Sequence, residues 1–215
     1  MFTTAQNDMI VNDKIFDFIY TIAMRDATLQ KAYELKKDGL TDEQKKSNEY
    51  KKELLLKNEA AKSIVRGYID DIIAGNNPCF CAVEEKLERS FDEFVEEHKL
   101  YLTKFTFGNC QKLINMTVKY FYIVTYSDPT IPTIRSHFND CHCPMDNVMI
   151  KAIKNELKKD NKSLKDFGVK NDDLKSWSKI VNSNTSQYDA FQEIVKYLAQ
   201  KQGVSPIEYD YLMWK

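Results

Sequence analysis

The sequence contains few of the residues that interrupt helices. Only six glycines and five prolines occur among 215 residues, while lysine, glutamate, leucine, isoleucine and alanine are plentiful. This composition favours helices over strands. No apolar run approaches the length of a membrane-spanning helix, and the N-terminus lacks the charged-then-apolar layout of a signal peptide. We therefore expect a cytoplasmic helical protein that does not enter a membrane.

Neither bulk charge nor cysteine pairing identifies a function. The net charge is −1, so a nucleic-acid partner would have to bind a local basic patch. The five cysteines are odd in number, which argues against a disulfide framework in a cytosolic chain. A hydrophobic content of 43% in a chain of this length is enough to build a core without such bridges.

Hydrophobic residues recur at helical spacing along most of the chain. The predicted helices cover residues 7–35, a long charged stretch from a capping box at 41–44 to Gly75, a segment around 87–95, and residues 107–126, 145–159, 186–202 and 205 onward. The segment 107–126 is apolar on nearly all sides, which is typical of a central buried helix.

These patterns predict an all-α protein. We expect a single domain over residues 1–215, either undivided or formed by two helical lobes, 1–104 and 105–215, with a cleft between them. We find no internal repeat and no hairpin signal, and we expect a monomer.

Two charged residues begin helices in the second half of the chain. Lys112 lies near the start of the apolar segment, and an amine among apolar groups can become neutral and attack an electrophilic carbon. Alternatively, its ammonium reaches solvent at the edge of the helix. Asp146 lies in the first turn of a later helix, where an acid complements the helix dipole or, if it faces a cleft, stabilises a carbocation.

The segment from Phe107 to Ile150 resembles the helix-hairpin-helix DNA glycosylases, and most of all their archaeal 8-oxoguanine branch. In that family a lysine opens an apolar, aromatic-rich helix, and a Pro-x-Asp segment starts a later helix. The matching residues here are Lys112 and, in Pro144-Met145-Asp146, Asp146, which lie 34 positions apart. The chain departs from the family in having one hairpin glycine, Gly108, and no cysteine set for an iron–sulfur cluster.

This resemblance implies excision of a damaged or modified base from double-stranded DNA, without a cofactor or metal. A flipped nucleotide would enter a pocket, Asp146 would stabilise the positive charge on the sugar, and Lys112 would form a Schiff base or leave attack to water. Backbone and side-chain groups at the helix start would contact DNA phosphates, which assigns that role to Gly108, Asn109 and Gln111.

Further residues of the chain suggest contacts with DNA. Lys151, Lys154 and Lys158 line one side of the helix at 145–159 and could neutralise phosphates, or they form an ordinary solvated face. Trp177 lies in a polar stretch, so we expect it to be exposed enough to stack on a base.

The cysteines allow a second type of site. Cys79 and Cys81 form one Cys-x-Cys pair, and Cys141 and Cys143 form another around His142. These residues could bind zinc, although structural zinc sites usually space their cysteines more widely. The alternative is that they are reduced cysteines packed as small apolar groups.

Arg135 and His142 form a third pattern. Their Arg-x6-His spacing resembles the catalytic motif of HEPN ribonucleases, which are helical and metal-free. The leading hypothesis is therefore a DNA glycosylase acting in repair or against modified foreign DNA. The alternatives are a helical binding module without chemistry and a HEPN-like ribonuclease.

Overall fold

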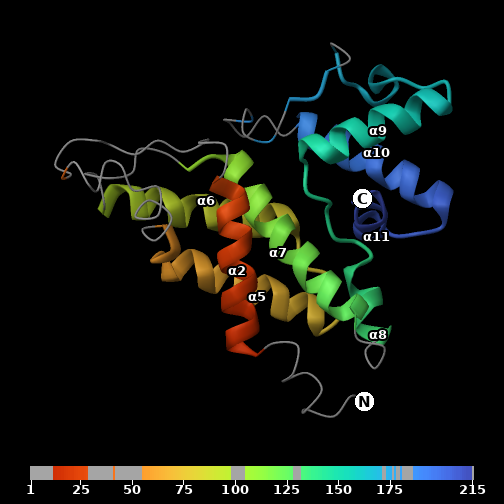
Figure 1. Cartoon of the computed structure of the whole chain (residues 1–215). Coiled ribbons are helices and arrows are strands. Elements are labelled where there is room, and N and C mark those ends of the chain that lie inside the picture. The colour runs from red at the N-terminus through yellow and green to blue at the C-terminus, as the bar shows by residue number, and fades with distance from the viewer. Residues whose placement is uncertain are drawn as a thin grey trace.

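The protein is built around one long helix, α7, which spans Phe107–Ser127. The computed structural model describes residues 12–28, 41, 55–97, 105–127, 132–170, 173–175, 177, 180 and 186–214. Figure 1 shows α7 passing between two groups of helices. Most residues of α7 from 107 to 125 are buried, so the prediction of a central helix is confirmed.

The first group contains α2 (Asp13–Thr28), α5 (Glu59–Ile73) and α6 (Phe80–Glu97), and all three contact α7 (Figure 1). Helix α2 lies along α7, and its Phe16 ring is 6.2 Å from the ring of Phe121. Each of these helices buries one apolar stripe, as the helical spacing of the apolar residues predicts.

The prediction of one continuous charged helix up to Gly75 is wrong, because a new helix begins after Asn58. Asn58 is the N-cap of α5, and its Oδ1 accepts the Ala61 N–H at 3.0 Å. Its Nδ2 also donates to the carbonyl oxygen of Ser90 in α6 at 3.2 Å. This buried amide ends one helix and ties the next to its neighbour. The capping box predicted at 41–44 lies outside the described residues apart from Thr41.

The second group follows α7 and completes the molecule. The short α8 (Pro132–Arg135) and the 3₁₀ turn η1 (Ser136–Phe138) lead to α9 (Asn147–Lys159), η2 (Leu164–Phe167), α10 (Ser186–Gln202) and α11 (Pro206–Met213). The predicted ends of the last helices are confirmed. Gly203 ends α10 with φ +69°, and Ser205 caps α11 with a proline at its first position.

One hydrophobic core joins both groups, so the described residues form a single all-α domain without strands. The division into lobes at residue 104 stays a prediction. Among the residues that the structure describes, no helix is long and apolar enough to cross a membrane.

Gly108 allows α7 to approach another segment closely. Its N–H donates to the carbonyl oxygen of Ile180 at 3.1 Å, and a Cβ at this position would lie 1.9 Å from the carbonyl oxygen of Trp177. Backbone atoms cannot move aside as a flexible side chain can. The glycine is therefore required by packing rather than by its own dihedral angles.

We predict that Gly108→Ala lowers the free energy of unfolding by about 2 kcal/mol or more, because the methyl group overlaps backbone. Gly67→Ala in α5 is the matched control: apart from the adjoining backbone of its own helix, no atom of the described residues lies within 4 Å of the new methyl group, so we expect a gain of roughly 0.5–1 kcal/mol. Urea denaturation of both variants measures the difference. A stabilised Gly108→Ala protein would contradict the close approach.

Candidate active site

Two lysine side chains extend from the same face of α7. Lys112 and Lys119 are seven residues apart, which is about two helical turns. Both are buried: 5% of the surface of the whole Lys112 residue and 1% of that of Lys119 are exposed. A buried ammonium group is stable only when it is paired. Each lysine therefore needs a carboxylate from another part of the chain.

Buried amides hold the connection that precedes Asp146. The Gln192 side chain of α10 makes two hydrogen bonds to the backbone of Cys143: Nε2 donates to the carbonyl oxygen at 2.8 Å, and Oε1 accepts the N–H at 3.0 Å. Asn115 of α7 donates to the same carbonyl oxygen at 3.5 Å. These bonds fix the chain between α7 and α10, three residues before Asp146.

Asp146 is both the N-cap of α9 and the partner of Lys112. Its backbone is extended, and its Oδ1 accepts the Met149 N–H at 2.9 Å. Its Oδ2 lies 3.1 Å from Nζ of Lys112. The structure thus brings together the two residues that the family resemblance pairs. Helix α9 begins at Asn147 rather than at Met145, because the cap residue itself stays outside the helix.

The surroundings of this pair favour a charged carboxylate. Burial works against ionisation of Asp146, but the Lys112 ammonium and the Met149 N–H hold the pKa of the carboxyl below its usual value. The Asp146 side chain keeps 20% of its surface exposed and that of Lys112 keeps 7%. The protein therefore shields most of the pair from solvent, and solvent reaches it mainly at the Asp146 carboxylate.

Lys119 makes a second pair that is sealed from solvent. Its Nζ lies 2.8 Å from Oδ2 of Asp210 in α11, and each side chain is only 1% exposed. Burial raises the pKa of the Asp210 carboxyl, although the Lys119 ammonium acts in the opposite direction. The Trp214 ring covers the Lys119 ammonium at 4.4 Å from the ring centre, while about half of this tryptophan stays exposed.

The start of α7 does not present the groups that were predicted to contact DNA. The Gly108 N–H is used by Ile180, as described above. Asn109 is fully buried, where it accepts from Thr106 and donates to the carbonyl oxygen of Ala27 at 2.6 Å. Gln111 is fully buried as well and donates to the Gly108 carbonyl oxygen. The prediction that these three residues face a phosphate is corrected, because their polar groups bond within the protein.

Trp177 is buried rather than exposed as predicted. Only 3% of its surface is exposed, so no face of the ring is available for stacking on a base. The polar residues around it in the sequence suggested exposure, but the backbone of Trp177 lies against Gly108. Its position is set by this long-range contact.

The lysine face of α9 reaches solvent as predicted. Lys151 and Lys158 are exposed, and Lys154 is partly buried and pairs with Asp173 at 3.1 Å. Whether this face binds DNA stays a prediction.

The cysteines and the histidine do not assemble into a metal site. Cys79 and Cys81 are exposed on the N-terminal side of α6, whereas Cys141 and Cys143 are buried. Within the described ranges, no group of three or more His, Cys, Asp or Glu side chains is arranged to hold a metal ion.

Arg135 and His142 do not share a helix as the residues of the ribonuclease motif do. Arg135 ends α8, and His142 lies in the connection after η1. The His142 ring packs 4.5 Å from the ring of Phe80, and its Nδ1 lies 2.9 Å from the hydroxyl oxygen of Tyr188. Burial, with a smaller effect of Lys196, lowers the pKa of His142 to about 4.

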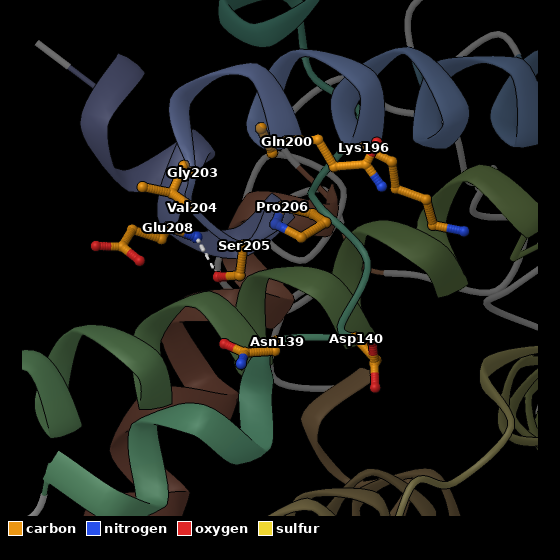
Figure 2. A pocket seen from close by; sticks show the side chains of 10 residues that line it. Asn139, Asp140, Lys196, Gln200, Gly203, Val204, Ser205, Pro206 and Glu208 are labelled. Carbon is orange, nitrogen blue, oxygen red and sulfur yellow. Dashed lines mark hydrogen bonds between the residues drawn. The ribbon is translucent and has the colours of Figure 1, made fainter.

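A pocket of about 470 Å³ lies between the connection that precedes α9 and the turn that joins α10 to α11 (Figure 2). Charges of both signs line it, among them Asp140, Lys196 and Glu208. Some polar groups are already engaged, since the Glu208 N–H donates to Ser205 Oγ at 3.3 Å and Lys196 pairs with Glu193 at 3.0 Å. No residue predicted from the sequence as a site residue lines this pocket.

No family model matches the chain, and neither the curated proteins nor the solved structures contain a significant match. The interpretation of the site therefore depends on its own geometry.

Several residues of this region were missed in the sequence. Lys119 could have been found, because a second lysine two turns after Lys112 lies on the same face of an apolar helix. Asp210 and Gln192 carry no local signal, since their partners are 91 and 49 residues away in the sequence.

We predict that breaking the sealed pair destabilises the fold. Lys119→Met or Asp210→Leu alone should each lower the free energy of unfolding by about 3 kcal/mol, because one charge stays buried without a partner. The double variant should lose much less than the sum of the two. A thermodynamic cycle by urea denaturation measures this coupling, and additive losses would contradict a direct pair.

We also predict a stability change that depends on His142. Between pH 4 and 6.5 the unfolded state binds more protons than the native state, because the native pKa is depressed. The free energy of unfolding should therefore fall as the pH is lowered through this window, by up to about 3 kcal/mol. His142→Gln should remove this part of the pH dependence. Equal pH profiles of the two proteins would show that the imidazole is not desolvated in the fold.

Proposed function

We propose that the protein is a DNA glycosylase that excises a damaged or modified base. The observation that carries this proposal is the 3.1 Å contact between Lys112 Nζ and Asp146 Oδ2, which joins two helix starts 34 residues apart. The resemblance of this segment to helix-hairpin-helix glycosylases assigns reacting roles to the same two residues.

The charge state of the pair suits cleavage of a glycosidic bond. When the bond between C1′ and the base breaks, its electron pair leaves with the base and positive charge develops on the sugar. A carboxylate beside C1′ stabilises this charge, and Asp146 is held ionised by Lys112 and by the amide of Met149. The exposed edge of Asp146 is where an extruded nucleotide would approach.

Lys112 provides a route to a covalent intermediate. Its ammonium can transfer a proton to the departing base, which leaves a neutral amine beside C1′. The amine then bonds to C1′, a proton passes from nitrogen to the ring oxygen, and the sugar ring opens to a protonated Schiff base. If Lys112 does not attack, water adds to C1′ and only the base is released.

A binding module without chemistry is the second candidate, and one observation favours it. Both oxygens of Asp146 are engaged within the protein, one as a helix cap and one as the partner of Lys112. An arrangement of this kind also stabilises a fold. The two functions differ in whether replacing the carboxylate changes a reaction or only the stability.

We predict that Asp146→Asn slows base release by roughly 100-fold or more. The variant should also lose stability, because the buried ammonium of Lys112 keeps no carboxylate partner, so circular dichroism must show that the assayed protein is folded. Asparagine caps a helix as well as aspartate does, so this variant removes the charge and keeps the cap. Lys112→Arg keeps a positive charge but removes the nucleophile, so it should abolish covalent trapping. The assay incubates the enzyme with duplexes carrying varied modified bases and adds borohydride to reduce a Schiff base.

The pair formed by Lys62 and Asp17, 2.8 Å apart between α5 and α2, supplies the matched control. Asp17→Asn and Lys62→Arg should leave base release and trapping at the wild-type level. A wild-type protein that releases no base from any duplex would exclude the glycosylase. Full activity of Asp146→Asn would exclude this site.

A further inference from the structure

The end of helix α9 carries a concentration of positive charge. Residues 151–170 contain seven lysines and three acidic residues, a net charge of +4 in a chain whose net charge is −1. Part of this charge surrounds a pocket of about 270 Å³, lined by Lys154, Leu157, Lys158, Lys162, Ser163 and Leu164.

The backbone at the end of α9 sets the shape of this pocket. Asn161 adopts the left-handed conformation with φ +52°. Its N–H donates to the Lys158 carbonyl oxygen at 3.1 Å, and the Lys162 N–H donates to the Leu157 carbonyl oxygen at 2.9 Å. This Schellman-type ending reverses the chain, so Lys162 returns beside the last turn of α9. It also satisfies helix carbonyl groups that lysine side chains would otherwise cap.

The lysines differ in how far their charge is neutralised. Lys154 is paired with Asp173, whose side chain is 70% exposed. Lys158 has no carboxylate partner within 4 Å among the described residues. The Lys162 ammonium lies over aromatic rings instead, 4.0 Å from the ring centre of Tyr197 and 5.6 Å from that of Phe167. Aromatic faces hold an ammonium group in place without cancelling its net charge.

Two features define the remaining walls. Leu157 and Leu164 are almost fully buried and form an apolar base. The Ser163 N–H is already used, because it donates to Asp166 Oδ2 at 2.7 Å. A ligand would therefore meet ammonium groups rather than backbone amides, and those groups select an anion.

We infer that this pocket binds a phosphate group, and that the group is a phosphodiester of a DNA strand. The identification of DNA rests on the proposed function, whereas the anion selectivity rests on Lys158 and Lys162 alone. Lys158 is twelve residues beyond Asp146, so it lies about 18 Å along the helix axis from the Asp146–Lys112 pair. The pocket thus anchors the backbone at a distance from the reacting nucleotide.

The test compares the salt dependence of DNA binding in the wild type and in the double variant Lys158→Gln/Lys162→Gln. Glutamine keeps much of each side-chain stem and removes the charge. Each phosphate contact contributes about 0.9 to the magnitude of the slope of log K against log salt concentration. In the double variant this magnitude should fall by roughly 1–2, and the affinity for DNA should fall about tenfold. Lys86→Gln, at an exposed lysine of α6, is the control and should leave the slope unchanged.

A second measurement separates the sources of phosphate. Inorganic phosphate should raise the melting temperature of the wild type above that in chloride of equal ionic strength, and it should not do so for the double variant. If phosphate stabilises only the wild type but the double variant binds DNA with an unchanged salt slope, the pocket binds free phosphate and not a phosphodiester of the duplex. An unchanged slope with no stabilisation by phosphate would overturn the pocket altogether.

These measurements are independent of base release. A reduced slope in a protein that excises no base would support the pocket and exclude the glycosylase. Base release that requires Asp146, with an unchanged slope and no effect of phosphate, would support the glycosylase and exclude the pocket.

Discussion

The structure depends on the pairing of two lysines that lie inside an apolar helix. Removing an ammonium group from water costs several kcal/mol, and an apolar neighbour cannot compensate for this loss. Helix α7 carries two such groups on one face, and each meets a carboxylate from a different later helix, Asp146 at the start of α9 and Asp210 in α11. These two contacts restrict where the second group of helices can lie on α7. The buried amides of Gln192 and Asn115 add to this restriction by holding the connection before α9.

The two pairs have the same chemistry and different surroundings. Lys119 and Asp210 are sealed on all sides, and the Trp214 ring covers the ammonium. Lys112 and Asp146 lie at a helix terminus, where the carboxylate retains an exposed edge. Only a pair with such an edge can meet a ligand without unfolding the domain. The proposed chemistry is therefore assigned to Lys112 and Asp146, and a structural role to Lys119 and Asp210.

The corrections to the sequence-based predictions share one cause. Asn109, Gln111 and Trp177 look available for binding, because polar residues and residues in polar stretches usually lie at the surface. In the structure all three are buried: Asn109 donates to the Ala27 carbonyl oxygen of α2, and the Trp177 backbone lies so close to Gly108 that no side chain fits there. Asn58 likewise has a long-range partner in Ser90, and it interrupts a pattern that otherwise predicts one continuous helix. Local spacing contains no information about contacts of this kind.

The sequence alone determined the helical class, the central position of α7 and the bounds of the last two helices, because periodicity and helix-ending signals are local properties. It also indicated Lys112 and Asp146, through the position of each at the start of a helix. Their separation of 3.1 Å, the sealed Lys119–Asp210 pair and the lysine pocket at the end of α9 were decided only by the tertiary structure. Each of these features joins side chains from separate helices or from a helix and the chain that folds back on it. Their distances follow from how the helices pack around α7.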